Sequence, residues 1–148
     1  INERDKLNQT PLRWACERGQ EDVVEYLIEQ DADIDLCDTW GIYPVAIAME
    51  YGHEEIVTSL LARGAECRSL SLNSNTPLHF AASMGSQSIV KHLVNAGCDP
   101  LSQNSSGLTP VMEAILGDWP ETVALLLAAN SEAGQIRDRL GRTCIHFA

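Results

Sequence analysis

The fold is decided by residues 76–99, which read TPLHFAASMGSQSIVKHLVNAGCD. Thr76 stands where the N-cap hydroxyl of a helix is wanted, and Pro77 follows at the first helical position, where a missing N–H is harmless. Gly85 ends this predicted helix because glycine accepts the left-handed backbone of a C-terminal cap. Paired apolar residues at helical spacing then predict a second helix, which Gly97 closes. The stretch is therefore predicted to form two short helices joined by a tight turn.

The same cassette recurs along the chain every 33 residues. Its prolines are Pro11, Pro44, Pro77 and Pro110, each with an alanine four residues further on, and a fifth copy begins at Thr143. A period between about 20 and 50 residues is typical of a solenoid, whose units are too small to bury their apolar faces alone and stack on their neighbours. The chain is therefore predicted to be one elongated repeat domain.

The spacing divides the chain into four full copies with a partial copy at each end. Polar stretches connect the copies, and Asp38-Thr39-Trp40-Gly41 in one of them is typical of a hairpin tip, because glycine supplies positive φ. Since neither end carries the polar cap that a repeat array needs, we expect the chain to be an excerpt of a longer array. The predicted boundaries are 1–5 for the end of a preceding repeat, 6–38, 39–71, 72–104 and 105–138 for repeats, and 139–148 for the start of a further one.

These copies resemble the ankyrin repeat family, whose pattern D-x-x-G-x-T-P-L-H-x-A-A-x-x-G-x-x-x-I-V-x-x-L-L-x-x-G-A-D is matched best between Thr76 and Asp99. Four copies in register make a chance match far rarer than a single short motif would. The resemblance implies an all-α repeat fold, an ankyrin-repeat solenoid of stacked helix-turn-helix units with projecting β-hairpin loops. It also implies a scaffold for protein–protein interaction, which binds a protein or peptide partner through its concave face.

Partner contacts in that family usually come from the hairpin tips and from the two residues before the glycine that ends the first helix. Many of these positions are apolar here although they should be exposed, and a contiguous exposed apolar stripe often marks an interaction site. Trp40 and Tyr51 are residue types that dominate binding energy at interfaces. The alternative is that these side chains pack on the neighbouring hairpin. The predicted partner-binding residues of the concave surface are Leu7, Trp40, Ile42, Glu50, Tyr51, Leu72, Asn73, Met84, Leu108 and Leu116.

Copies two and four depart from the pattern. Tyr43 replaces the capping threonine of copy two, which predicts a loss of about 1 kcal/mol of cap stabilisation. In copy four Asp118 replaces the turn glycine, and Trp119 follows it as a minor candidate for a second contact surface. Glu113 stands where the other copies are apolar, so its carboxylate must reach water or find a partner. We therefore hypothesise that copy four is a loosened repeat or one that a partner completes.

The net charge of −11 bears on the kind of partner. Such a field repels phosphate backbones, so we expect no nucleic acid and favour a neutral or basic protein, unless the acids are simply solvated outer helix faces. The longest apolar run, residues 123–129, is far shorter than the roughly 18 residues of a membrane span, so no membrane insertion is expected. Five cysteines without a C-x-x-C pair argue against a disulfide framework and indicate a cytoplasmic or nuclear location.

The sequence carries no pattern typical of catalysis. No histidine has a metal-ligand partner three or four residues away, and no phosphate-binding loop or nucleophile motif occurs. For His79 and His146, which occupy the position of the family's histidine, the resemblance implies a structural hydrogen bond to neighbouring backbone or to a threonine hydroxyl. We therefore expect no enzyme activity, small-molecule substrate, metal or cofactor. The alternatives to a binding scaffold are a regulatory or substrate-recruiting region of a larger enzyme or channel, and a structural spacer or assembly element.

Overall fold

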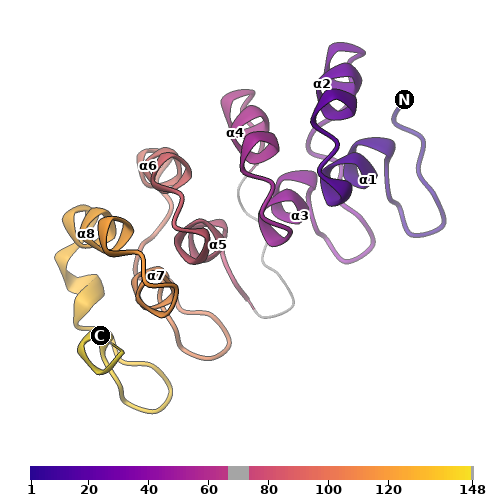
Figure 1. Cartoon of the computed structure of the whole chain (residues 1–148). Helices are drawn as coiled ribbons and strands as arrows, with labels where there is room; N and C mark the ends of the chain where they lie inside the picture. The colour runs from indigo at the N-terminus through magenta and orange to yellow at the C-terminus, as the bar shows by residue number, and fades with distance from the viewer. Residues whose placement is uncertain (67–73, 148) are drawn as a thin grey trace. The chain divides into compact units, whose positions relative to one another are not determined.

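The chain folds into pairs of short helices joined by loops, as the sequence predicts (Figure 1). The computed structural model describes residues 1–66 and 74–147, and within them it contains helices and turns but no strand. The predicted hairpin loops are thus present as tight turns without a strand ladder. The helices are α1 (Pro11–Arg18), α2 (Glu21–Glu29), α3 (Pro44–Glu50), α4 (Glu54–Ala62), α5 (Pro77–Met84), α6 (Gln87–Asn95), α7 (Pro110–Leu116) and α8 (Pro120–Ala129), with 3-10 helices η1 (Ser131–Gly134) and η2 (Cys144–His146).

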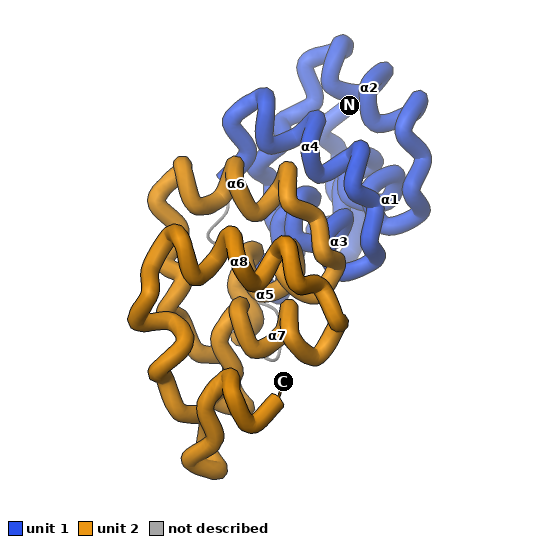
Figure 2. The backbone as a smooth tube through the Cα atoms, turned by 60° about the vertical axis from the view of Figure 1, so that its left-hand side comes forward, with its two compact units in different colours: residues 1–69 blue, residues 70–148 orange. Residues whose placement is uncertain are grey.

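Two compact units divide the chain, unit 1 with residues 1–69 and unit 2 with residues 70–148 (Figure 2). In unit 1, α1 packs against α2 and α3, and α3 packs against α4. In unit 2, α5 packs against α6 and α7, α7 packs against α8, and η2 begins the next copy against α7. Within each unit, neighbouring helix pairs therefore bury their apolar faces against each other, as the repeat period predicts.

The positions that recur in every copy form the core of both units. The residue after each anchoring proline is buried, and so is the alanine four residues after that proline. These residues are Leu12, Val45, Leu78 and Val111, with Ala15, Ala48, Ala81 and Ala114. Removing their apolar surface from water stabilises the fold by about 25 cal/mol per Å². The residues that recur in each copy therefore stabilise the scaffold.

The position that ends the first helix is left-handed in all four copies. Its φ is 68° at Gly19, 76° at Gly52, 72° at Gly85 and 59° at Asp118. Glycine adopts this backbone without steric cost, and aspartate tolerates it better than most side chains do. The turn of copy four therefore keeps its shape without the glycine that the pattern calls for.

The TPLH opening of copy three is held by the buried imidazole of His79. Its Nδ1 accepts the backbone N–H of Thr76 at 3.1 Å, and its Nε2 lies 2.9 Å from the carbonyl oxygen of Leu108. Because a carbonyl can only accept, Nε2 carries the proton, and burial lowers the pKa of His79, which favours this neutral form. The structural role implied for this histidine is confirmed, and His146 makes the same bond to the N–H of Thr143.

The caps of the other first helices differ. Thr10 accepts the N–H of Arg13 at 3.2 Å, whereas Tyr43 makes no side-chain cap bond, as predicted. In copy four, Met112 stands where copy three has its histidine, and the buried hydroxyl of Thr109 has no hydrogen-bond partner among the described residues. A buried hydroxyl without a partner costs on the order of 1–3 kcal/mol, so this cap is a weak point of unit 2.

Replacing Met112 with histidine is expected to stabilise unit 2 by about 1 kcal/mol. The introduced imidazole would accept from Thr109, as His79 does from Thr76, in a site that is already buried. The urea midpoint at pH 8, where the imidazole is neutral, measures the gain. Met112→Leu is the control because it fills the space without a hydrogen bond. An equal gain from both variants would show that packing, and not the hydroxyl, is the cause.

Trp119 ties the second helix of copy four to copy three. Its indole N–H donates to the carbonyl of Ser83 at 2.9 Å, and its ring lies against Gly85 and Gly117. On α8, the hydroxyl of Thr122 donates to the carbonyl of Gly85 at 3.2 Å. Trp119 is 41% exposed, but its N–H group and part of its ring are engaged within unit 2. These contacts favour packing over a second contact surface as its main role.

Candidate protein-binding face

The predicted partner-binding residues lie on hairpin loops and at the ends of first helices. We define the loop face of a unit as its hairpin loops together with the first helix of each copy, from which the loops project in Figure 1. Leu72 and Asn73 lie outside the described residues. The loop face of unit 1 carries Leu7, Trp40, Ile42, Glu50 and Tyr51, and the loop face of unit 2 carries Met84, Leu108 and Leu116.

Four large apolar side chains are exposed on the loop face of unit 1. The exposed fractions are 44% for Leu7, 40% for Trp14, 57% for Trp40 and 56% for Tyr51. Glu50 is exposed, and Ile42 is half-buried. Three of the four are tryptophan or tyrosine, the side chains most enriched among the residues that dominate protein–protein binding.

An aspartate holds each hairpin loop of unit 1. Oδ1 of Asp38 accepts the N–H groups of the second and fourth residues after it, at 2.9 and 3.0 Å, and Asp5 makes the same pair of bonds in the preceding loop. The side chains thus mimic a backbone turn. The N–H of Thr39 donates to the carbonyl of Leu7 at 3.1 Å, so the two loops lie side by side. Leu7 and Trp40 are therefore presented by adjacent loops of defined shape.

A buried ion pair fastens the second of these loops to α1. Nε of Arg13 lies 3.1 Å from Oδ2 of Asp38, and the two side chains are 8% and 0% exposed. Arg13 also pairs with Glu17 one helical turn later. Since Oδ1 of Asp38 already holds the loop's N–H groups, its two oxygens join the loop that carries Trp40 to the first helix of copy one.

The end of α3 is held against α1 by His53. Its Nε2 lies 3.1 Å from the carbonyl oxygen of Glu17, and Tyr51 stacks on its ring with the planes 8° apart. On α1, the guanidinium carbon of Arg18 lies 5.6 Å from the centre of a Trp14 ring. Each of these two exposed aromatic rings therefore has a neighbouring side chain beside it.

The loop face of unit 2 carries both apolar and polar side chains. Leu116, the last residue of α7, is 56% exposed, and Leu140 in the loop of copy five is 75% exposed, whereas Met84 and Leu108 are half-buried. Copy four has Glu113 and Ser106 at the positions where unit 1 has tryptophans. On unit 2 the exposed apolar side chains are therefore separated by the polar residues of copy four.

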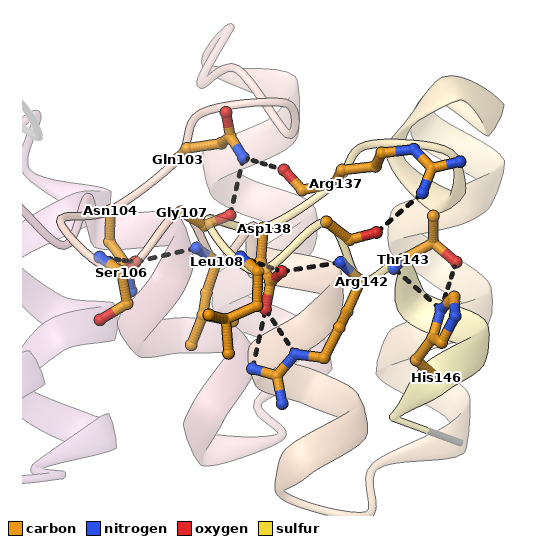
Figure 3. Close-up of polar contacts among 12 residues, drawn as sticks. Gln103, Asn104, Ser106, Gly107, Leu108, Arg137, Asp138, Arg142, Thr143 and His146 are labelled. Carbon is orange, nitrogen blue, oxygen red and sulfur yellow. Dashed lines mark hydrogen bonds and ion pairs between the residues drawn. The ribbon is translucent and has the colours of Figure 1, made fainter.

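The loops of copies four and five are joined by side-chain amides (Figure 3). Asn104 accepts the N–H groups of the second and fourth residues after it, both at 3.0 Å, and Asp138 holds its own loop in the same way. The amide of Gln103 donates to the carbonyls of Gly107 and Arg137, both at 2.7 Å. The loop that carries Leu108 is therefore fixed at its base and to its neighbour.

Glu113 has a partner inside unit 2. Its Oε1 accepts from the side-chain amide of Asn104 at 3.1 Å, and the side chain is half-buried. Burial raises the pKa of Glu113, and the bond from Asn104 opposes that rise. The sequence predicts that this carboxylate must reach water or find a partner, and the bond from Asn104 confirms that it has a partner.

Sequence reasoning missed the residue that shapes the loops. Asp5, Asp38, Asn104 and Asp138 each stand three residues before a left-handed position, and each accepts two backbone N–H groups. The sequence did carry a signal for this role, because an aspartate or asparagine recurs at the same position of several copies. Trp14 was also missed, because its position reads as scaffold in the other copies. Its exposure places it with the candidate contacts.

Residues 1–66 and 74–147 carry neither a cluster of metal-binding side chains nor a helix suited to crossing a bilayer. No group of three or more His, Cys, Asp or Glu side chains in that part of the chain is arranged to hold a metal ion. None of the helices described there is long and apolar enough to cross a bilayer.

The chain is similar to known repeat proteins over most of its length. A family model described as ankyrin repeats in three copies matches residues 14–104 and residues 78–148. A curated relative, the nuclear factor NF-kappa-B p105 subunit of Rattus norvegicus, is 54% identical over 41 residues. That stretch spans 28% of this chain and 4% of the relative. With the helix pairs, the TPLH opening and the repeat period in place, the chain belongs to the ankyrin repeat family.

Proposed function

We propose that this chain binds a protein or peptide partner through its loop faces, which correspond to the concave surface of the family. Ankyrin repeats are generally modules of protein–protein interaction. The observation that carries the proposal for this chain is the exposure of Leu7, Trp14, Trp40 and Tyr51 on the hairpin loops and first-helix segments of unit 1. Large apolar side chains gathered on the surface of a folded unit are typical of an interaction site.

The geometry supports a site that is formed before the partner arrives. The Asp38 bonds and the Arg13 ion pair fix the loop beneath Trp40, and the rings of His53 and Tyr51 lie parallel. Rigid aromatic anchors lose little entropy on binding and bury a large area, so they contribute most of the affinity of an interface. The charge distribution favours a neutral or basic partner, because acidic side chains outnumber basic ones by 21 to 10 over the whole chain.

The face can be tested before any partner is known. A photo-crosslinking amino acid placed at Trp40 in the full-length protein is expected to capture a partner in its own cells. The same amino acid at Tyr26, which is 59% exposed on α2 away from the loops, is the matched control. Partners captured equally at both positions, or only at Tyr26, would contradict the proposed face.

Replacing Trp40 with alanine is then expected to weaken binding of the captured partner by about 2 kcal/mol, because a central aromatic anchor is lost. The melting temperature should change little, since more than half of this side chain is exposed in the free chain. Titration calorimetry and a thermal melt on the same preparation measure both quantities. Unchanged affinity together with a lower melting temperature would show that Trp40 packs on its neighbours instead.

A further inference from the structure

We propose that Glu113 is a preformed anchor for a basic side chain, lysine or arginine, of the partner that the loop face of unit 2 binds. The proposal rests on the proposed function and adds to it the chemistry of one contact. Three features of Glu113 support the proposal: its position on α7, its hydrogen bond to Asn104, and the lack of an ion pair to it among the described residues.

The position of Glu113 is that of an apolar side chain on the first helix of every other copy: Trp14, Ile47, Phe80 and Phe147. In unit 1 the two side chains at this position differ, because Trp14 is 40% exposed whereas Ile47 is buried. The position can therefore reach the surface but does not do so in every copy. Glu113 precedes the exposed Leu116 by three residues, so the two lie on the same side of α7. A ligand that covers Leu116 thus lies within reach of the carboxylate.

The side-chain amide of Asn104 orients the carboxylate of Glu113, and all of its hydrogen-bonding positions are occupied. Nδ2 of Asn104 donates to Oε1 of Glu113 at 3.1 Å and to the side-chain oxygen of Asn75 at 2.8 Å. Oδ1 of Asn104 accepts two N–H groups of its own loop. An amide has two N–H donors and one oxygen with two lone pairs. All four positions are occupied, so Asn104 cannot turn away and Oε1 is held in one place.

The second oxygen of Glu113 has no partner among the described residues. The described ion pairs join other groups, and in unit 2 Arg142 is bound to Asp138, whereas Arg137 donates to the carbonyl of Gly141. A neutral amide orients a carboxylate but does not balance its charge. The loop face of unit 2 therefore presents a half-buried negative charge with a free oxygen, which an ammonium or guanidinium group would complement.

Partial burial without a paired cation disfavours the ionised form of Glu113 in the chain without a partner. The folded state raises the pKa of Glu113 through burial, so the group contributes stability when protonated, and that contribution is lost as the pH rises through the folded pKa. The raised pKa means that ionisation of Glu113 is less favourable in the folded chain than in the unfolded chain. A binding residue that opposes folding is typical of a functional site, where affinity and stability are traded against each other.

A random twelve-residue peptide library displayed on phage tests the anchor with the intact chain. Peptides selected on the wild type are expected to share a lysine or arginine, and at least a tenfold loss of affinity is expected with Glu113→Gln. Glu121→Gln, an exposed carboxylate in the first turn of α8, is the matched control and should leave affinity unchanged. Changing the shared basic residue of the peptide to glutamine should weaken binding to the wild type but not to Glu113→Gln.

The thermal stability of the Glu113→Gln variant distinguishes a binding role of Glu113 from a structural role. The melting temperature of Glu113→Gln at pH 7 is expected to equal or exceed that of the wild type, so its loss of affinity cannot come from unfolding. Selected peptides that depend on Leu116 but share no basic residue would overturn the anchor and leave the proposed function standing. If no selected peptide depends on any loop-face residue, the proposed function fails and the anchor fails with it.

Discussion

Replacing Gly85 with alanine is expected to destabilise unit 2 by about 3 kcal/mol, from a strained backbone and from a clash. Gly85 has a φ of 72°, which costs an alanine about 1–2 kcal/mol. A Cβ atom at this position would also lie 2.7 Å from Cε2 and Cε3 of Trp119. The ring can leave only by breaking its bond to the carbonyl of Ser83, so the stack of copy four on copy three is lost in part.

Gly97→Ala separates the two causes within the same unit. Gly97 has a φ of 87°, but nothing lies within 4 Å of its Cβ position. This variant should lose about 1–2 kcal/mol from the backbone alone. Hydrogen exchange of the amides of α5 to α8 measures both variants in unit 2 directly. Equal losses from the two variants would show that Trp119 does not press on Gly85.

A second substitution should recover part of the loss. In the Gly85→Ala background, Trp119→Ala removes the ring that clashes, so it should cost less than it does in the wild type. The interaction between two such contacting sites is measured by a double-mutant cycle and commonly lies between about 0.5 and 3 kcal/mol. Additive effects would contradict the close contact.

The helices were predictable because their signals are local and repeat. The threonine and proline signals lie at the start of the first helix, and the left-handed residue lies at its end. Because these signals recur with the 33-residue period, the helix boundaries of one copy predict those of the others. The burial of Leu12 and Ala15, and of their counterparts, follows from the same register. Copy four has Asp118 in place of the turn glycine, and its backbone is left-handed all the same. The register of the repeat therefore predicts the backbone conformation even where the residue type differs.

The contacts of the candidate site were not predictable to the same degree. Trp119 meets Gly85, and Asn104 meets Asn75, across about one repeat, and which atoms meet depends on the direction of each side chain. Register places two residues on neighbouring copies but does not decide whether they pack, bond or stay exposed. Trp14 is the clear case, since its position is scaffold in other copies and exposed surface here.

Arg13→Met is expected to destabilise unit 1 by about 3–5 kcal/mol, because it leaves the carboxylate of Asp38 buried without its cation. Asp38 cannot turn to water, since its side chain is fully buried and its Oδ1 holds the N–H groups of the Trp40 loop. Methionine retains most of the aliphatic stem, so the lost charge is the main change. Urea unfolding at pH 7, followed through exchange of the α1 and α3 amides, measures the effect.

Two further variants show whether the buried charge is the cause. Arg63→Met breaks the pair with Glu25, whose side chains are 43% and 42% exposed, and should cost less than about 1 kcal/mol. Asp38→Asn in the Arg13→Met background removes the uncompensated charge and keeps an oxygen for the loop, as Asn104 does in copy four. The double variant should therefore be more stable than Arg13→Met alone. If it is less stable, the arginine supports unit 1 by packing, and the loop that presents Trp40 does not depend on the ion pair.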